Sequence, residues 1–156
     1  VFMRILVISD SHGNTRNIER AVESQPEANI IIHLGDGADD IVDLEFVYRD
    51  KQFYQVAGNC DWGSSLPLEG ELKVADKTIF FVHGHEYRVK TNLQQIKMEA
   101  KKRNADIVLF GHTHLPITEY DDELYLLNPG SLQYADGTYG IIDITDAGIS
   151  VQIIKV

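Results

Sequence analysis

Five short polar clusters hold the side chains of this sequence that are best suited to bind metal ions. Each cluster directly follows a short apolar run, and most contain glycine beside the candidate ligand. The ligand-type side chains in these clusters are Asp10, His12, Asp36, Asn59, His83, His112 and His114. Carboxylate, imidazole and amide ligands without a set of thiolates suit Mn²⁺, Fe²⁺, Zn²⁺, Co²⁺ or Ni²⁺ better than they suit a structural zinc ion.

This ligand set is too large for one ion. Two divalent ions about 3.5–4 Å apart, sharing one carboxylate, would use a set of this size well. We therefore expect two divalent metal ions, with Mn²⁺ as the first choice and Fe²⁺, Zn²⁺, Co²⁺ or Ni²⁺ as alternatives. A water that bridges two such cations becomes hydroxide near neutral pH, so the site would contain its own nucleophile.

Short apolar runs must position these clusters. Residues 5–8, 30–32, 79–82 and 107–110 are rich in β-branched side chains and too short for helices, which predicts strands buried on both faces. Helical patterns between them are centred on Ile18 behind an Asn14 cap, on Ile41, Leu44 and Tyr48, and on Leu93, Ile96 and Ala100 behind a Thr91-Asn92-Leu93-Gln94 capping box. Ligand sites of α/β sheets lie at the carboxyl ends of strands, where all five clusters should fall.

The last third of the chain has a different pattern. Predicted strands at 117–120 and 123–127 flank Asp121-Asp122, and predicted strands at 139–145 and 148–156 flank Asp146-Ala147. An α/β part followed by antiparallel strands favours an α/β fold with two packed mixed β-sheets, a β-sandwich, flanked by helices.

Length and composition limit the other possibilities. The 156 residues predict a single domain over 1–156. Lys and Arg number 14 against 24 Asp and Glu, a net charge of −10, which disfavours duplex nucleic acid and anionic membrane surfaces as partners. Cys60 is the single cysteine, no apolar run is long enough to span a bilayer, and the N-terminal residues do not resemble a signal peptide. We expect a cytoplasmic protein.

The ordered clusters resemble the calcineurin-like metallophosphoesterase superfamily. Its pattern is D-x-H, G-D-x-x-D, G-N-H-[DE], a histidine after a strand, and G-H-x-H. The matching residues here are Asp10/His12, Gly35-Asp36/Asp39, Gly58-Asn59-Cys60-Asp61, His83 and Gly111-His112/His114. The Asn128-Pro129-Gly130-Ser131 turn is similar to a turn of the small single-domain bacterial and archaeal branch of this superfamily. That branch includes a phosphodiesterase. Cys60 departs from the general pattern, which has a histidine there.

The resemblance implies a four-layer metallophosphoesterase-like architecture and a role for each motif residue. One metal would be held by Asp10, His12, Asp36 and His114, and the other by Asp36, Asn59, His83 and His112, with Asp36 bridging. The metal-bridging hydroxide would attack phosphorus while the metals and Asn59 neutralise the equatorial oxygens. Asp39 would orient a ligand imidazole, and His85 would contact substrate or hold its loop. Asp61 would either do similar work or cap the loop that follows.

The resulting interpretation is a dinuclear metal-dependent phosphoesterase that hydrolyses phosphodiester bonds of a small substrate. The alternative is a non-catalytic protein-binding scaffold of the same fold, such as the vacuolar-sorting subunit of this superfamily, whose ligand set is degraded. An amidohydrolase needs a barrel of about 250 residues, and a metallo-β-lactamase needs further ligands after His114, where Leu115-Pro116 stand. His33 lies inside a predicted strand and is interpreted as a hydrogen-bonded core histidine. The sequence leaves the oligomeric state open, a homo-oligomer included.

Overall fold

The computed structural model describes residues 2–156 and contains strands, three α-helices and one 3-10 turn. The strands are β1 (Met3–Ile8), β2 (Ala28–His33), β3 (Gln52–Gln55), β4 (Glu69–Val74), β5 (Lys77–Val82), β6 (Ile107–Leu109), β7 (Ile117–Asp121), β8 (Leu124–Asn128), β9 (Thr138–Thr145) and β10 (Gly148–Lys155). The helices are α1 (Thr15–Ser24), α2 (Val42–Val47) and α3 (Gln94–Lys102), and the 3-10 turn is η1 (His85–Tyr87).

The strands form two mixed five-stranded sheets. The first has the order β10-β9-β1-β2-β3, with β1, β2 and β3 parallel and β9 antiparallel to β1. The second has the order β4-β5-β6-β8-β7, with β5, β6 and β8 parallel between antiparallel edge strands. The predicted pair of packed mixed sheets is therefore confirmed.

The apolar runs form strands because each of their faces packs against a different layer. On β1, Ile5 and Val7 join the core cluster between the two sheets, whereas Leu6 and Ile8 join the cluster that contains residues of α1 and α2. Full burial of each such side chain contributes roughly 1.5–3 kcal/mol. A strand apolar on both faces is thus stable only inside a sheet that is covered on both sides.

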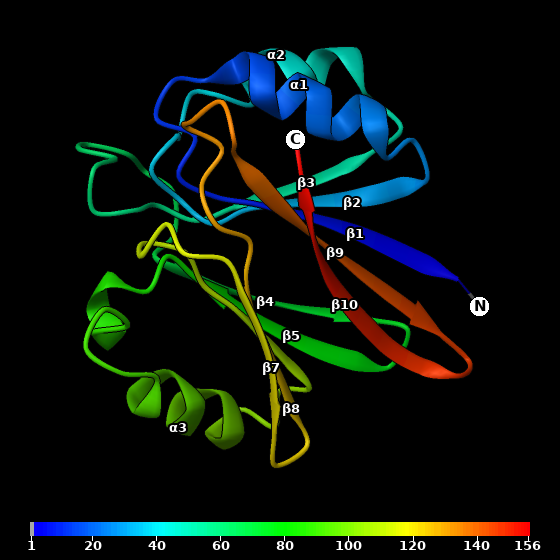
Figure 1. Ribbon diagram of the computed structural model, residues 1–156, viewed down its shortest axis with the longest axis vertical. Helices are drawn as coiled ribbons and strands as arrows, with labels where there is room; N and C mark the ends of the chain where they lie inside the picture. The colour runs from blue at the N-terminus through cyan, green and yellow to red at the C-terminus, as the bar shows by residue number, and fades with distance from the viewer. Residues whose placement is uncertain (1) are drawn as a thin grey trace.

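The second sheet repeats this arrangement with α3. Phe80 and Val108 turn away from the inter-sheet core and pack in one cluster with Ile96 and Ala100 of α3. Figure 1 shows the resulting order of layers, with α1 and α2 over one sheet and α3 over the other. This is the predicted four-layer architecture. No helix of the described chain is both long and apolar enough to cross a bilayer.

Some of the predicted helix caps and turns were confirmed and others were wrong. The Asn14 side chain caps α1 by accepting a hydrogen bond from the Asn17 N–H. The predicted capping box at residues 91–94 is wrong, because Asn92 accepts from the Gln94 N–H and Leu93 occupies the N-cap position. The two-residue turn at Asp146-Ala147 is confirmed, since β9 ends at Thr145 and β10 begins at Gly148.

The other hairpin turn lies one residue later than predicted. Strand β7 extends through Asp121, so the turn consists of Asp122 and Glu123, which both have positive φ. Strand β3 was expected before the cluster at residues 57–61 but without bounds, and β4 was not predicted, because exposed polar residues interrupt the apolar pattern of both strands.

The parallel strands explain how distant motifs meet. Polar clusters follow β1, β2 and β3 in the first sheet and β5 and β6 in the second. Parallel strands in one sheet end at the same edge, so each sheet presents its clusters along one edge. The loops at these two edges contact one another, as the contact between His83 Nδ1 and Leu34 O and the hydrogen bond from the His112 N–H to Asp10 Oδ2 illustrate.

Candidate metal centre

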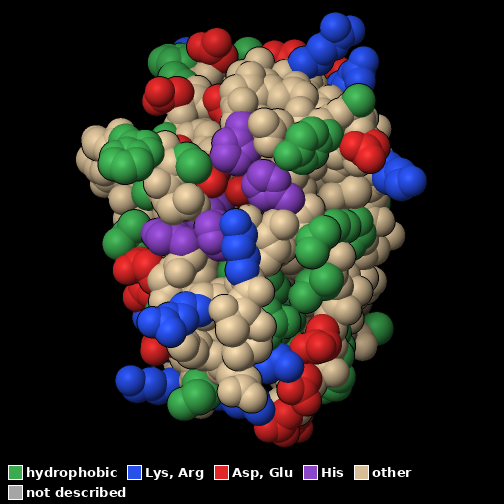
Figure 2. Space-filling model, turned by 60° about the vertical axis from the view of Figure 1, so that its left-hand side comes forward, with side chains coloured by type: hydrophobic (Ala, Val, Ile, Leu, Met, Phe, Trp, Pro, Cys, Tyr) green, Lys and Arg blue, Asp and Glu red, His purple; other side chains and the backbone are tan. Residues whose placement is uncertain are grey.

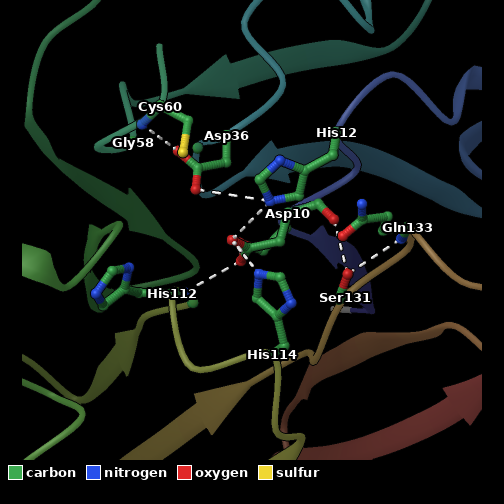
Figure 3. A network of polar contacts seen from close by, with 12 residues as sticks. Asp10, His12, Asp36, Gly58, Cys60, His112, His114, Ser131 and Gln133 are labelled. Atoms are coloured by element: carbon green, nitrogen blue, oxygen red, sulfur yellow. Dashed lines mark hydrogen bonds and ion pairs between the residues drawn. The ribbon is translucent and has the colours of Figure 1, made fainter.

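Side chains from both sheets converge at these strand ends. Figure 2 shows the histidines gathered around a hollow with acidic side chains visible between them. In Figure 3 the rings of His12 and His114 point towards the Asp10 carboxylate, and dashed lines join one nitrogen of His12 to both Asp10 and Asp36. The carboxylates of Asp10 and Asp36 and the ring of His83 have ligand atoms within 4.8 Å of one another. A second group of this kind consists of Asp10, His12 and His114.

The Asp10 carboxylate is completely buried and only half satisfied. Its Oδ2 accepts hydrogen bonds from the Ser9 hydroxyl and, at 3.1 Å, from the His112 N–H. Its Oδ1 has no hydrogen-bond partner among the described residues. Three imidazole Nε2 atoms surround this Oδ1, at 3.2 Å from His114, 3.7 Å from His12 and 3.9 Å from His83. Because a buried unpaired carboxylate oxygen is costly, this arrangement fits a bound cation.

The hydrogen bonds of His83 lead to the same conclusion. Its Nδ1 lies 2.8 Å from Leu34 O and must therefore carry the proton, which leaves a lone pair on Nε2 of the neutral ring. That Nε2 faces Asn59 Oδ1 at 3.0 Å and Asp36 Oδ2 at 3.3 Å. A lone pair cannot pair with two acceptor oxygens, so this position requires a cation, either a proton or a metal ion.

The pKa values of His83 and Asp36 reflect the need for a cation between them. Burial acts to lower the pKa of His83, but the carboxylates of Asp36 and Asp10 outweigh it and raise the pKa. Burial likewise acts to raise the pKa of Asp36, but hydrogen bonds from His83 and the Cys60 N–H hold it well below its usual range. A proton on His83 thus takes the place that the ligand set offers to a metal ion.

Two further histidines complete this side of the site. The Nδ1 of His112 lies 3.2 Å from the Nε2 of His83, and burial together with the charges of His83 and Lys90 lowers the pKa of His112 to about 4. The ring centre of His85 lies 5.5 Å from that of His83. Its Nδ1 is buried and has no hydrogen-bond partner within the described chain, and burial lowers its pKa. His85 therefore lies beside the candidate ligands, where it was predicted.

The backbone at the site adopts an uncommon conformation. Five of the ligand-type residues have left-handed φ values: Asp10 (52°), His12 (44°), Asp36 (59°), His112 (69°) and His114 (64°). Each left-handed residue that is not a glycine costs roughly 1–2 kcal/mol. Backbone strain of this kind concentrates at functional sites, and here it occurs in the loops after β1, β2 and β6.

Close contact between two of the loops depends on glycine. A Cβ atom on Gly58 would lie 2.1 Å from Asp36 Oδ1. A Cβ atom on Gly35, whose φ is +108°, would lie 2.7 Å from the Gly58 nitrogen. The loops after β2 and β3 could not approach so closely with larger residues at these positions.

Asp61 holds those two loops together. Its carboxylate accepts hydrogen bonds of 2.8–3.0 Å from the backbone N–H groups of Asp36, Gly37, Ala38 and Gly58. Of the two roles considered for Asp61, the hydrogen bonds thus show a loop cap, although the loop it caps precedes it in the sequence. Asp61 contacts no imidazole in the described structure and positions Asp36 through the backbone.

Asp39 does not orient a ligand imidazole in this structure. Its side chain is exposed and makes no hydrogen bond or ion pair within the described residues. The neighbouring Asp40 takes the structural position instead, because its carboxylate accepts from the Ser11 hydroxyl at 2.6 Å and the Gly13 N–H at 2.8 Å. The G-D-x-x-D spacing selected Asp39, but the loop directs the carboxylate of Asp40 towards Ser11 and Gly13.

His33 belongs to this supporting network. It is completely buried, its Nδ1 accepts from the Gly35 N–H, and its Nε2 lies 2.9 Å from the Ser11 hydroxyl. Burial lowers the pKa of His33 to about 4 despite the nearby Asp40. The interpretation of His33 as a satisfied core histidine agrees with these contacts.

The turn at residues 128–131 supports the two histidine-bearing loops. The Asn128 side chain donates to Gly111 O at 3.1 Å and to the Thr113 hydroxyl at 2.9 Å. The Ser131 hydroxyl donates to Asp10 O at 2.8 Å, a contact drawn in Figure 3. The turn could be recognised in the sequence, but the contacts that its side chains make are visible only in the structure.

Cys60 is an exposed free thiol at the edge of the site. Its sulfur, an Asp36 carboxylate oxygen and a His12 ring nitrogen lie within 4.8 Å of one another, and Figure 3 shows the sulfur beside the carboxylate. Burial and the negative charge of Asp36 raise the pKa of the Cys60 thiol. A cleft of about 700 Å³ opens at this side and is also lined by Trp62.

Comparison with known proteins identifies the family. Residues 3–147 match the calcineurin-like phosphoesterase superfamily domain. The chain belongs to this superfamily. It is 32% identical over 133 residues to a probable metallophosphoesterase of Bacillus subtilis, covering 84% of this chain and 76% of the relative. It is 29% identical over 160 residues to a phosphodiesterase of Methanocaldococcus jannaschii, covering 90% and 93%. The predicted resemblance, and with it a metal-dependent phosphoesterase, is confirmed.

Solved structures of this superfamily have the same fold. A Streptococcus pneumoniae protein described as a predicted phosphoesterase superposes with a TM-score of 0.83 at 24% identity, covering 99% of this chain and 90% of that one. Vacuolar protein sorting 29 from Cryptosporidium parvum superposes with a TM-score of 0.76 at 16% identity, covering 99% and 98%. At these identities the two structures show the architecture alone.

Proposed function

We propose that this member of the superfamily is a dinuclear metal-dependent phosphodiesterase acting on a small phosphate ester. The observation that carries the proposal is the buried Asp10 Oδ1, which has no hydrogen-bond partner in the described chain although three imidazole nitrogens surround it. Two divalent ions, with Mn²⁺ as the first choice, would supply an activated water and neutralise charge on the phosphate.

The proposed ligand roles are those that the resemblance implies, and the positions of the side chains support them. Asp10, His12, Asp36 and His114 would hold one ion, and Asp36, Asn59, His83 and His112 the other. Asp36 suits a bridging role because its Oδ2 lies 3.7 Å from the Nε2 of His12 and 3.3 Å from that of His83, one residue from each proposed set.

The chain's other residues would orient the substrate and the ligands. The Asn59 amide, at 3.0 Å from His83, can donate an N–H to a phosphate oxygen while its Oδ1 faces the metal position. The His85 ring lies beside His83 and His112, where it would contact substrate or hold its loop. Asp39 is proposed to act at the cleft and not on an imidazole.

A preference for diesters is supported by Cys60, which stands where the general family pattern has a histidine. Cys60 gives no imidazolium charge beside the phosphate, and a diester carries one negative charge where a monoester carries two. The name of the relative from Methanocaldococcus jannaschii points in the same direction.

The test is hydrolysis of a matched set of esters by protein reconstituted with Mn²⁺, Zn²⁺, Co²⁺, Ni²⁺ or Fe²⁺. We expect bis(4-nitrophenyl) phosphate to be cleaved faster than 4-nitrophenyl phosphate, and metal removal by chelation to abolish both activities. If the protein binds metal but cleaves neither ester with any of these metals, the enzyme is rejected and the protein-binding scaffold is left. The likeness in fold to vacuolar protein sorting 29 is the reason for that alternative.

The remaining features of the proposal concern the whole chain. We propose a single domain over residues 1–156 and a cytoplasmic location, for which an exposed free cysteine suits a reducing compartment. Duplex nucleic acid stays disfavoured as a partner by the net charge of −10.

A further inference from the structure

A cleft of about 700 Å³ lies next to the candidate metal centre. Its walls come from the loops after β2 and β3, and the candidate ligands His12 and Asp36 also line it. Binding sites for small molecules usually have volumes of about 300–1,000 Å³. The cleft therefore has room for an organic group attached to a phosphate at the metal centre.

Negative charge dominates this cleft. Asp39, Asp40 and Asp61 line it, and its lining contains no lysine or arginine among the described residues. Asp40 and Asp61 use their oxygens to hold backbone and hydroxyl groups, whereas the exposed Asp39 carboxylate has no partner in the described chain. A negatively charged ester group would be repelled from these carboxylates, and a positively charged one would be attracted.

A further group in the cleft matches a cationic nitrogen. Trp62 is 90% exposed, and the face of an indole ring attracts ammonium groups. Trp62 and Asp39 thus offer an aromatic face and a free carboxylate in one cleft.

We propose that the cleft binds a primary ammonium group on the substrate, so that the protein prefers phosphate esters of amino alcohols. The proposal rests on the proposed function, because the phosphate must sit at the metal centre for its ester group to enter the cleft. An ammonium group carries a positive charge and N–H donors, and both suit the free carboxylate of Asp39.

The test compares two ligands that differ only in this group. Trp62 is the single tryptophan of the chain, so its fluorescence reports directly on the cleft. Zinc-loaded protein is titrated with 2-aminoethyl phosphate and with propyl phosphate, in which a methyl group replaces the ammonium. We expect 2-aminoethyl phosphate to bind about two- to five-fold more tightly. Asp39→Asn should remove this preference. Asp43→Asn, the same change at an exposed position on α2 outside the cleft, should keep it.

Equal binding of the two ligands, or no change in Trp62 emission with either, would overturn the cleft proposal. Hydrolysis of bis(4-nitrophenyl) phosphate by the same preparation decides the proposed function separately. Hydrolysis without an ammonium preference rejects the cleft alone. A preference without hydrolysis under any metal rejects the phosphodiesterase and leaves an ammonium-binding cleft.

Discussion

The candidate ligands combine buried charge with a costly backbone conformation. Asp10 and Asp36 are nearly inaccessible to solvent, and both have positive φ. Neither property stabilises the metal-free chain, since the unpaired buried Oδ1 of Asp10 and the left-handed residues both raise its free energy. Metal binding would remove the first cost, so the residues of the site should be understood as a preformed ligand set.

The bridging role of Asp36 can be tested by comparison with a ligand of one ion. Asp36→Asn should reduce the affinity for both ions and lower activity by more than about 100-fold, since even residues behind metal ligands contribute 10–100-fold. His114→Ala should lose one ion and retain the other. Elemental analysis after dialysis gives the metal content of each variant, and equal mild losses in both would contradict the bridge.

Cys60 should influence which esters are cleaved. A thiol is a poor proton donor to an alkoxide and brings no positive charge, whereas histidine can supply both. Cys60→His should therefore raise the ratio of monoester to diester cleavage, by an expected factor of about ten at most. Steady-state kinetics on 4-nitrophenyl phosphate and bis(4-nitrophenyl) phosphate measure the ratio. An unchanged ratio would show that the cysteine only fills space beside Asp36.

Among the elements, the loops after β2 and β3 depend on one carboxylate. Asp61→Ala leaves four backbone N–H groups without their acceptor, and we expect it to lower the free energy of unfolding by about 3 kcal/mol. Asp39→Ala removes the same group from an exposed position and should change it by less than about 0.5 kcal/mol. Urea unfolding of the metal-free proteins measures both, and similar losses would contradict the loop-holding role.

The connection between β2 and the loop after β1 should be sensitive to acid. His33 has a folded-state pKa of about 4 against an ordinary value of 6.5, so unfolding takes up a proton between these pH values. The free energy of unfolding should therefore fall as pH falls from about 6.5 to 4, by about 3 kcal/mol from this group.

His33→Gln isolates that contribution. The difference in free energy of unfolding between the metal-free native protein and this variant should shrink as pH is lowered across the same interval. Urea unfolding at a series of pH values gives the difference, and a difference that does not vary with pH would show that His33 does not titrate as described.

The elements that the sequence predicted best are those with continuous apolar runs. Strands β1, β2, β5 and β6 are buried on both faces, so burial alone marks them, and their ends position the ligand clusters. Strand β4 has alternating exposed charges and a glycine, which hide it from that signal. The motif spacing selected Asp39 and missed Asp40, because the supporting role depends on which carboxylate the loop directs towards Ser11 and Gly13.

For the molecule as a whole, the site lies where the edges of the two sheets meet. Asp10 and Asp36 come from the first sheet, and His83, His112 and His114 from the second, with the largest apolar cluster packed between the sheets. Metal ions bound by both sets of ligands would join the two sheets. The acidic chain would then present a local positive charge to phosphate despite its net charge of −10.

The measurement that tests this account most directly is the number of metal ions per chain. The purified protein is stripped of metal, reconstituted with Mn²⁺ or Zn²⁺, freed of excess ions and subjected to elemental analysis, with circular dichroism to verify the fold. The seven ligand-type side chains predict close to two ions per chain. A folded protein that binds one ion or none would contradict the dinuclear centre.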